Sequence, residues 1–115
     1  MKLLQIAFLS VIAFALIFSF AFAESEAEKG KVLFNDAKFA GGVKACSSCH
    51  PNGKGLEKAG DKKEFGETKK SLEEMINSCI VNANKGKALV VTSEQMKQMV
   101  AYIKSLKSKK PAAGY

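Results

Sequence analysis

The pentapeptide Cys46-Ser47-Ser48-Cys49-His50 contains the single histidine of the chain and two of its three cysteines. The third cysteine is Cys79, so any metal or redox chemistry of this sequence must pass through four side chains. Two thiols three positions apart on a helical turn can reach one bound group together. The small Ser47 and Ser48 between them leave that approach open. The sequence therefore predicts one site built around this segment.

C-x-x-C-H is the attachment signature of c-type haem. The two thiols can form thioether bonds to the two vinyl groups of one porphyrin, and the adjacent imidazole can bind the iron from the proximal side. We therefore predict one covalent haem c, held by Cys46 and Cys49, with His50 as an axial iron ligand.

Three other interpretations use the same residues. A thioredoxin-like redox pair would need a βαβ pattern, which the sequence lacks. A disulfide between the two cysteines of the motif would leave His50 without a role. A zinc site that includes Cys79 would require the neighbouring side chains of Cys49 and His50 to converge on one ion. Haem attachment uses all the residues of the motif and is our prediction.

The first 23 residues have the pattern of a secretory signal peptide. Lys2 precedes an apolar run, which ends in the A-x-A sequence Ala21-Phe22-Ala23. We expect cleavage after Ala23, a cytochrome domain over residues 24–108 and a flexible tail over 109–115. The run is nearly long enough to span a bilayer, so an uncleaved membrane anchor is the alternative. Cleavage predicts a protein without membrane attachment, in the periplasm or an equivalent extracytoplasmic compartment.

Lysine supplies all 18 basic residues of the 115-residue chain, and the formal net charge is +7. The absence of arginine argues against a nucleic-acid partner, because bidentate recognition of phosphate and guanine uses the guanidinium group. The lysines are spread along the chain, which suits long-range attraction of an acidic redox partner protein. The length leaves room for one small domain and excludes a multidomain enzyme.

The spacing of apolar residues predicts an all-α fold, because no segment has the sustained alternation of a strand. We expect a first helix over residues 27–35, with Val32 and Leu33 or Phe34 facing inward. Residues 54–70 are rich in Gly, Lys and Glu and predict a solvated loop around a cofactor.

Two further helices have start signals in the sequence. Ser71 and Glu74 have the spacing of a capping box, and the helix that follows places Cys79 on its inward face. Thr92 and Gln95 have the same spacing and predict the start of the last helix.

Residues 27–107 resemble a class I cytochrome c. The similarity includes a first helix with Gly30 and Phe34, the C-x-x-C-H motif, a wrapping loop, and a last helix that carries Tyr102. It implies a cytochrome c-like monohaem fold in which the first and last helices cross near these three residues. It also implies electron transfer through an exposed haem edge ringed by lysines. Pro51 directly follows His50, and the later proline that commonly follows the motif in this family is missing, so the carbonyl that accepts the His50 Nδ1 proton is not identified.

The second axial ligand departs from the family pattern. Relatives commonly place a methionine where this chain has Leu89, which carries no sulfur. We predict Cys79 as the distal ligand, with Met75, one helical turn earlier, as the alternative. Cys79 as a buried thiol or as half of an intermolecular disulfide also stays open. The remaining candidates are more remote or sit where methionine usually fills a core: Met96, Met99, Lys85 and Lys87.

The distal ligand decides the function, because an anionic thiolate stabilises ferric iron and a thioether stabilises ferrous iron. Ligation by His50 and Cys79 predicts a low-potential haem that binds NO or CO when ferrous. The chain is similar to the small paired nitric-oxide-binding cytochromes c of anammox bacteria, which implies a second small cytochrome c in a heterodimer. The alternatives are an ordinary His/Met electron carrier and the haem subunit of a sulfur-oxidising enzyme. We predict a carrier or gas-binding protein rather than an enzyme.

Overall fold

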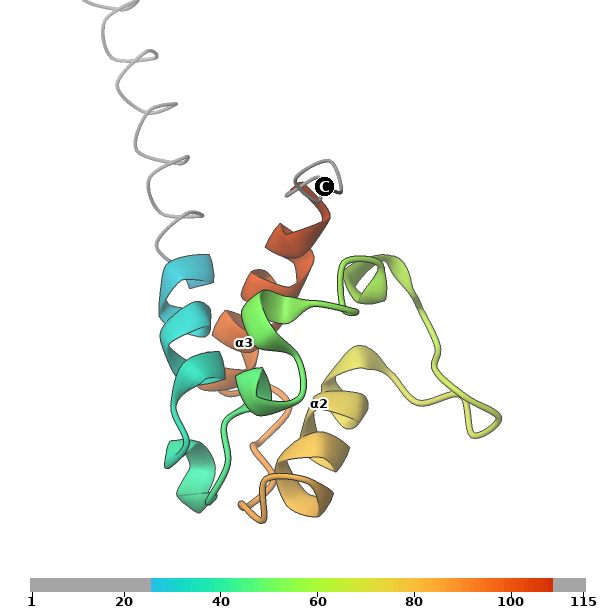
Figure 1. Cartoon of the computed structure of the whole chain (residues 1–115). Coiled ribbons are helices and arrows are strands. Elements are labelled where there is room, and N and C mark those ends of the chain that lie inside the picture. Colours follow the sequence, from blue (N-terminus) through green and yellow to red (C-terminus); the bar gives the residue numbers. More distant parts are fainter. Residues whose placement is uncertain (1–25, 109–115) are drawn as a thin grey trace, which may run out of the picture.

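The computed structural model describes residues 26–108, which form helices joined by turns and loops (Figure 1). The only strand-like pairing in this range is an isolated bridge between Phe65 and Lys70. The predicted all-α fold is therefore confirmed. The predicted signal peptide, residues 1–23, and the predicted tail, residues 109–115, lie outside the described residues.

Residues 26–35 are helical, followed by the longer helices α2 (Leu72–Asn82) and α3 (Glu94–Ser105). Five short 3-10 turns connect or extend these helices: η1 (Phe39–Gly41), η2 (Cys46–Ser48), η3 (Pro51–Gly53), η4 (Ala59–Asp61) and η5 (Leu106–Ser108). None of the described helices is long and apolar enough to cross a membrane.

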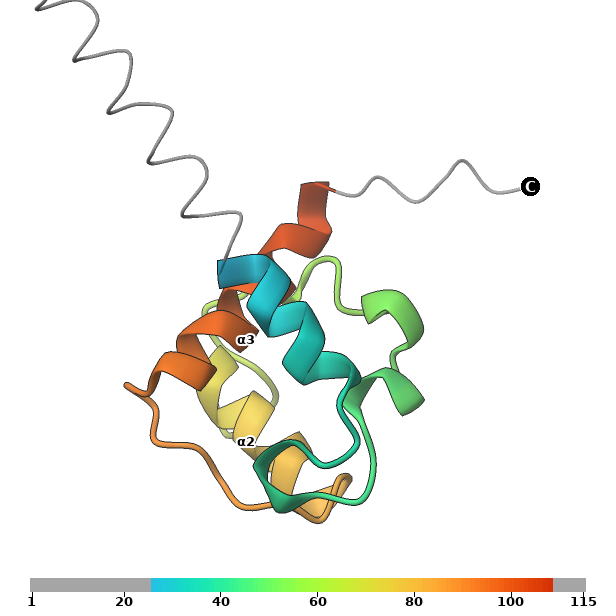
Figure 2. The same ribbon diagram turned by 90° about the vertical axis from the view of Figure 1, so that its left-hand side faces the viewer.

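The helix of residues 26–35 crosses α3, as Figure 2 shows. At the crossing Gly30 lies so close to α3 that a Cβ there would collide with the Gln98 carbonyl and with Cβ of Tyr102. One turn later the rings of Phe34 and Tyr102 are in contact, with centroids 5.0 Å apart. The helix crossing implied by the family resemblance is thus present, at the residues expected.

The face that this first helix buries differs from the prediction in one residue. Phe34 is 1% exposed, and Leu33 packs against the core. Val32 is 70% exposed, so its predicted inward position is wrong. Gly30 and Phe34 are four residues apart and share the face toward α3, which leaves Val32, halfway between them, on the opposite side of the helix.

The capping box at the start of α2 is confirmed. The Ser71 hydroxyl accepts a hydrogen bond from the Glu74 amide at 3.2 Å, and the Glu74 carboxylate accepts one from the Ser71 amide at 2.7 Å. Both bonds satisfy backbone amides that have no partner within the helix. The helix then buries Leu72, Ile76 and Ile80 on one face.

The start of α3 is one residue later than predicted. Its N-cap is Ser93, whose hydroxyl accepts a hydrogen bond from the Met96 amide at 3.3 Å. The prediction of Thr92 as the cap is wrong, because the Ser93 amide donates to the Val90 carbonyl at 2.9 Å. This bond closes a turn over residues 90–93 and places Thr92 inside the turn, before the helix.

Met96 and Met99 are buried core residues, each 1% exposed, as their spacing on the apolar face of the last helix predicts. They pack among the other side chains that are almost completely enclosed: Phe34, Ile80 and Leu106.

Candidate haem site

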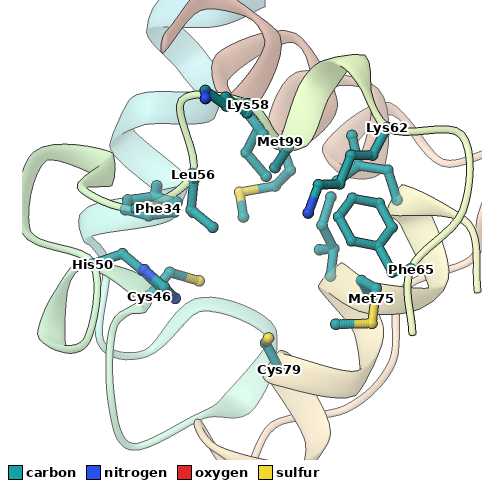
Figure 3. Close-up of a pocket in the computed structure, with 15 residues that line it drawn as sticks. Phe34, Cys46, His50, Leu56, Lys58, Lys62, Phe65, Met75, Cys79 and Met99 are labelled. Atoms are coloured by element: carbon teal, nitrogen blue, oxygen red, sulfur yellow. The ribbon is translucent and has the colours of Figure 1, made fainter. Parts of the chain in front are cut away.

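A cavity of about 310 Å³ opens between the C-x-x-C-H segment, the loop over residues 54–70 and α2. Figure 3 shows Cys46 and His50 on one side of it, Met75 on the other side and Cys79 at its lower edge, the last two residues belonging to α2. Phe34 and other core side chains close its inner end, and most of the lining is apolar. The cavity therefore collects the sulfur and nitrogen donors of this chain in an otherwise apolar space.

The motif forms two successive tight turns. In the first, the amides of Cys49 and His50 both donate to the Cys46 carbonyl, at 3.3 and 3.1 Å. In the second, which has Pro51 in its first position, the Gly53 amide donates to the His50 carbonyl at 2.8 Å. These turns direct Cys46 and His50 into the cavity. Cys49 is exposed and lies outside the lining.

The orientation of the His50 ring is fixed by its own loop. His50 Nδ1 lies 3.0 Å from the Lys54 carbonyl oxygen. A carbonyl can only accept, so Nδ1 carries the proton and Nε2 keeps a free lone pair. This is the arrangement of a metal-binding histidine, in which a hydrogen bond at one nitrogen sets the tautomer and direction of the other. The Lys54 carbonyl is thus the acceptor of the His50 Nδ1 proton, which the sequence alone does not identify.

Asn84 supports the motif from the turn after α2. This side chain is 7% exposed, and its Nδ2 donates to Cys46 Sγ at 3.4 Å. Its backbone carbonyl accepts a hydrogen bond from the Val43 amide at 2.8 Å. Asn84 therefore binds both the Cys46 side chain and the backbone of the segment that precedes Cys46. No local sequence pattern marks the contact of Asn84 with Cys46, 38 positions earlier.

The two cavity-lining thiols share one electrostatic feature. Burial raises the pKa of the Cys46 thiol, and the Asn84 hydrogen bond opposes this rise only in part. Cys79 lines the cavity but is an exposed residue, so the alternative of a buried thiol is not supported. Partial desolvation still raises the pKa of its thiol, and the nearby Cys49 sulfur adds to the effect. Both thiols therefore keep their protons at neutral pH unless a cation or a covalent bond replaces them.

The three cysteines are free, so the disulfide interpretation has no support in this structure. Within residues 26–108 no three side chains of the His, Cys, Asp and Glu types come close enough to hold a metal ion. The zinc interpretation, which needs Cys46, Cys49, His50 and Cys79 around one ion, therefore fails on geometry.

Leu89 has no side-chain donor atom for iron and is not in the cavity lining. Its backbone is hydrogen-bonded to α2. The Asn77 side-chain amide donates to the Leu89 carbonyl at 2.8 Å and accepts from the Leu89 amide at 2.7 Å. The Leu89 side chain packs against the hydrophobic core. Lys85 and Lys87 from the same loop do not line the cavity. The sulfur atoms that do line it, apart from Cys46, belong to Cys79, Met75 and Met99.

The residues fit a c-type haem. The cavity offers an apolar interior, a histidine with a fixed tautomer, a thiol from the attachment motif and a second sulfur on the facing helix. These features match what a covalently attached porphyrin with two axial ligands requires.

Comparison with known proteins agrees with this geometry. The model of one protein family, described as SoxA/TsdA, cytochrome c domain, matches residues 29–111. No curated protein and no solved structure gives a match. The matched segment contains the attachment motif and all the residues that line the cavity. It includes every described helix except the first three residues of the first helix, residues 26–28. A cytochrome c domain implies covalently bound haem c and electron transfer. The chain belongs to the SoxA/TsdA cytochrome c domain family.

Proposed function

We propose that this chain is an exported monohaem cytochrome c with His50 and Cys79 as its two axial ligands. Haem c supplies a one-electron Fe(III)/Fe(II) couple when bound. Cys46 and Cys49 attach the group, and the Lys54 carbonyl holds His50 so that Nε2 faces the cavity. The observation that carries the proposal is the presence of His50, from the motif, and Cys79, from α2, in the lining of one apolar cavity (Figure 3).

Cys79 is preferred to Met75 for a chemical reason. Both line the cavity from α2, one helical turn apart. A thiolate is attracted to a ferric iron more strongly than a thioether because it carries a negative charge, and this attraction would offset the cost of removing the thiol proton. Thiolate ligation stabilises the ferric state and gives the protein a low reduction potential.

We further propose that the ferrous protein binds NO or CO. A ferrous iron would hold the Cys79 thiolate less strongly than a ferric iron because it carries one positive charge less, so protonation of the sulfur could release this ligand. A small gas molecule could then bind on the side of the cavity that Cys79 lines.

Spectra and potentials of two variants test the ligand assignment. Cys79→Met is expected to raise the reduction potential and to add the weak far-red charge-transfer band of methionine ligation. Met75→Leu is the matched control on the same helix face, and it is expected to leave both unchanged. The reverse result would assign the distal position to Met75. Addition of CO to the dithionite-reduced protein tests gas binding, and an unchanged spectrum would exclude it.

The lysines support a partner of opposite charge. Attraction between this basic chain and an acidic redox protein, such as a second small cytochrome c, can raise the encounter rate up to ~10³-fold at low salt. It fades beyond ~8 Å at physiological ionic strength. The rate of electron transfer to an acidic partner should therefore fall as salt is added, and a rate that does not depend on salt would count against this partner.

A second candidate function is the haem subunit of a sulfur-oxidising enzyme. The match of residues 29–111 to the SoxA/TsdA cytochrome c domain favours it. Turnover of thiosulfate, with reduction of the haem or of an added electron acceptor, would establish this function, and absence of turnover would leave the carrier or gas-binding role.

A further inference from the structure

Two cationic side chains, Lys58 and Lys62, line the haem cavity. Figure 3 shows the Lys62 nitrogen directed into the cavity, whereas the Lys58 nitrogen lies at its margin. Lys62 Nζ is 5.6 Å from the centroid of the Phe65 ring, which also lines the cavity. The loop over residues 54–70 thus brings a positive charge to an apolar space.

This charge has no acidic partner in the described structure. No Asp or Glu lines the cavity, and the ion pairs among residues 26–108 involve Lys29, Lys97 and Lys107. The Phe65 ring attracts the ammonium only weakly, because solvent still reaches the charge. An ammonium group directed at apolar surroundings is better satisfied by an anion. The lining therefore predicts that what fills the cavity carries negative charge near Lys62.

Haem c has such charges in a defined place. Its two propionate carboxylates lie on the half of the porphyrin opposite to the carbons that form the thioether bonds. Cys46, one attachment residue, and Lys62 lie on different sides of the cavity (Figure 3). We propose that Lys62 pairs with a haem propionate and thereby raises the reduction potential. This inference rests on the proposed haem attachment through Cys46 and Cys49.

The effect on potential follows from charge. A propionate anion near the iron favours the ferric state, and the Lys62 ammonium neutralises part of that effect. Lys62 is exposed to solvent, which screens the interaction and limits its size. Removing the charge should therefore shift the equilibrium moderately toward ferric iron.

Lys62→Gln tests the proposal, with Lys63→Gln as the matched control. Both variants lose one positive charge from adjacent positions, but Lys63 does not line the cavity. We expect Lys62→Gln to favour the ferric state by a factor of about three to ten, which is about 30 to 60 mV for a one-electron couple. Lys63→Gln should give a much smaller shift, and Lys62→Arg should restore the potential of the unmodified protein. In the resonance Raman spectrum, only Lys62→Gln should move the propionate bending band.

Equal potentials and Raman spectra of Lys62→Gln and Lys63→Gln, with haem attached in both, would overturn the pairing and leave haem attachment intact. A Lys62→Gln variant with a changed axial-ligand spectrum would also overturn it, because Lys62 would then be an iron ligand. Absence of covalent haem from the unmodified protein, measured by mass, would refute the proposed function itself.

Discussion

His50 illustrates how much of this site depends on single contacts. Its Nδ1 proton is held by a carbonyl four residues later, at 3.0 Å, so the ring needs no partner from another helix to point Nε2 into the cavity. Cys46, in contrast, depends on a residue 38 positions away, because Asn84 donates to its sulfur. The predicted iron ligand His50 is therefore positioned by its own loop, and the predicted attachment residue Cys46 is positioned by the turn after α2.

Tyr102 should make the stability of the protein sensitive to alkaline pH. Burial raises the pKa of its phenol, and the Glu28 carboxylate adds to the rise. The folded state thus holds this proton more tightly than the unfolded chain. The corresponding stability is present below the ordinary pKa of about 10 and is lost as pH rises through the folded value. In urea unfolding at a series of pH values, the free energy of unfolding should fall more steeply above pH ~10 for the unmodified protein than for Tyr102→Phe. Parallel curves would contradict this prediction.

At the scale of one residue, the sequence identified site residues of types that are rare in this chain, cysteine and histidine, and missed contacts made by common groups. The chain has one histidine and three cysteines; Cys46, His50 and Cys79 line the cavity, whereas Cys49 is exposed and lies outside the lining. Asn84 and the Lys54 carbonyl have no such signal. A backbone carbonyl has no sequence signature, and the contact of Asn84 exists only because the folded chain returns to the motif.

At the scale of helices, local patterns predicted types and approximate ends. The Ser71 capping box is correct because it is complete within four residues. The cap of α3 was misplaced because Thr92 and Ser93 are adjacent hydroxyl residues and both precede an apolar periodic segment. The choice between them depends on the turn closed by the Val90 carbonyl, which is not visible in the spacing.

The two candidate caps provide a matched test. Ser93→Ala removes the hydroxyl that accepts from the Met96 amide, and it should lower the free energy of unfolding by about 1 kcal/mol. Thr92→Ala, one residue earlier and outside the helix, should change it by less than about 0.5 kcal/mol. Chemical denaturation of both variants measures the difference, and equal losses would show that the helix start is shared between the two residues.

The crossing of the first helix with α3 should tolerate no side chain at Gly30. A Cβ there would lie 2.8 Å from Cβ of Tyr102 and would meet the Gln98 carbonyl as well. Since backbone atoms cannot move aside cheaply, Gly30→Ala should cost about 3 kcal/mol. Lys31→Ala, at the next and exposed position of the same helix, should change the free energy of unfolding by less than about 0.5 kcal/mol. Thermal unfolding compares the two, and a mild effect of Gly30→Ala would show that the helices can separate.

At the scale of the molecule, one open cavity is lined by most elements of a small domain. Its lining includes side chains from the first helix, α2, α3 and the loop over residues 54–70. A domain of this size gains little stability from its polypeptide core alone. We therefore expect the described helices to depend on the group that the cavity holds.

Removal of the attachment residues should show this dependence. The double variant Cys46→Ala and Cys49→Ala is expected to lose covalent haem, much of its helical circular dichroism and its cooperative thermal transition. Cys79→Ala keeps both attachment residues and should retain the haem and a cooperative transition. A double variant that stays helical and unfolds cooperatively would show that the polypeptide is stable by itself.

The paired hydrogen bonds between Asn77 and Leu89 tie the loop after α2 to the helix that carries Cys79 and Met75. They use both polar atoms of the Asn77 side chain and both polar groups of the residue 89 backbone. A displacement of α2 relative to this loop would therefore break two hydrogen bonds at once. We expect the helix and the loop to move together when the far side of the cavity adjusts.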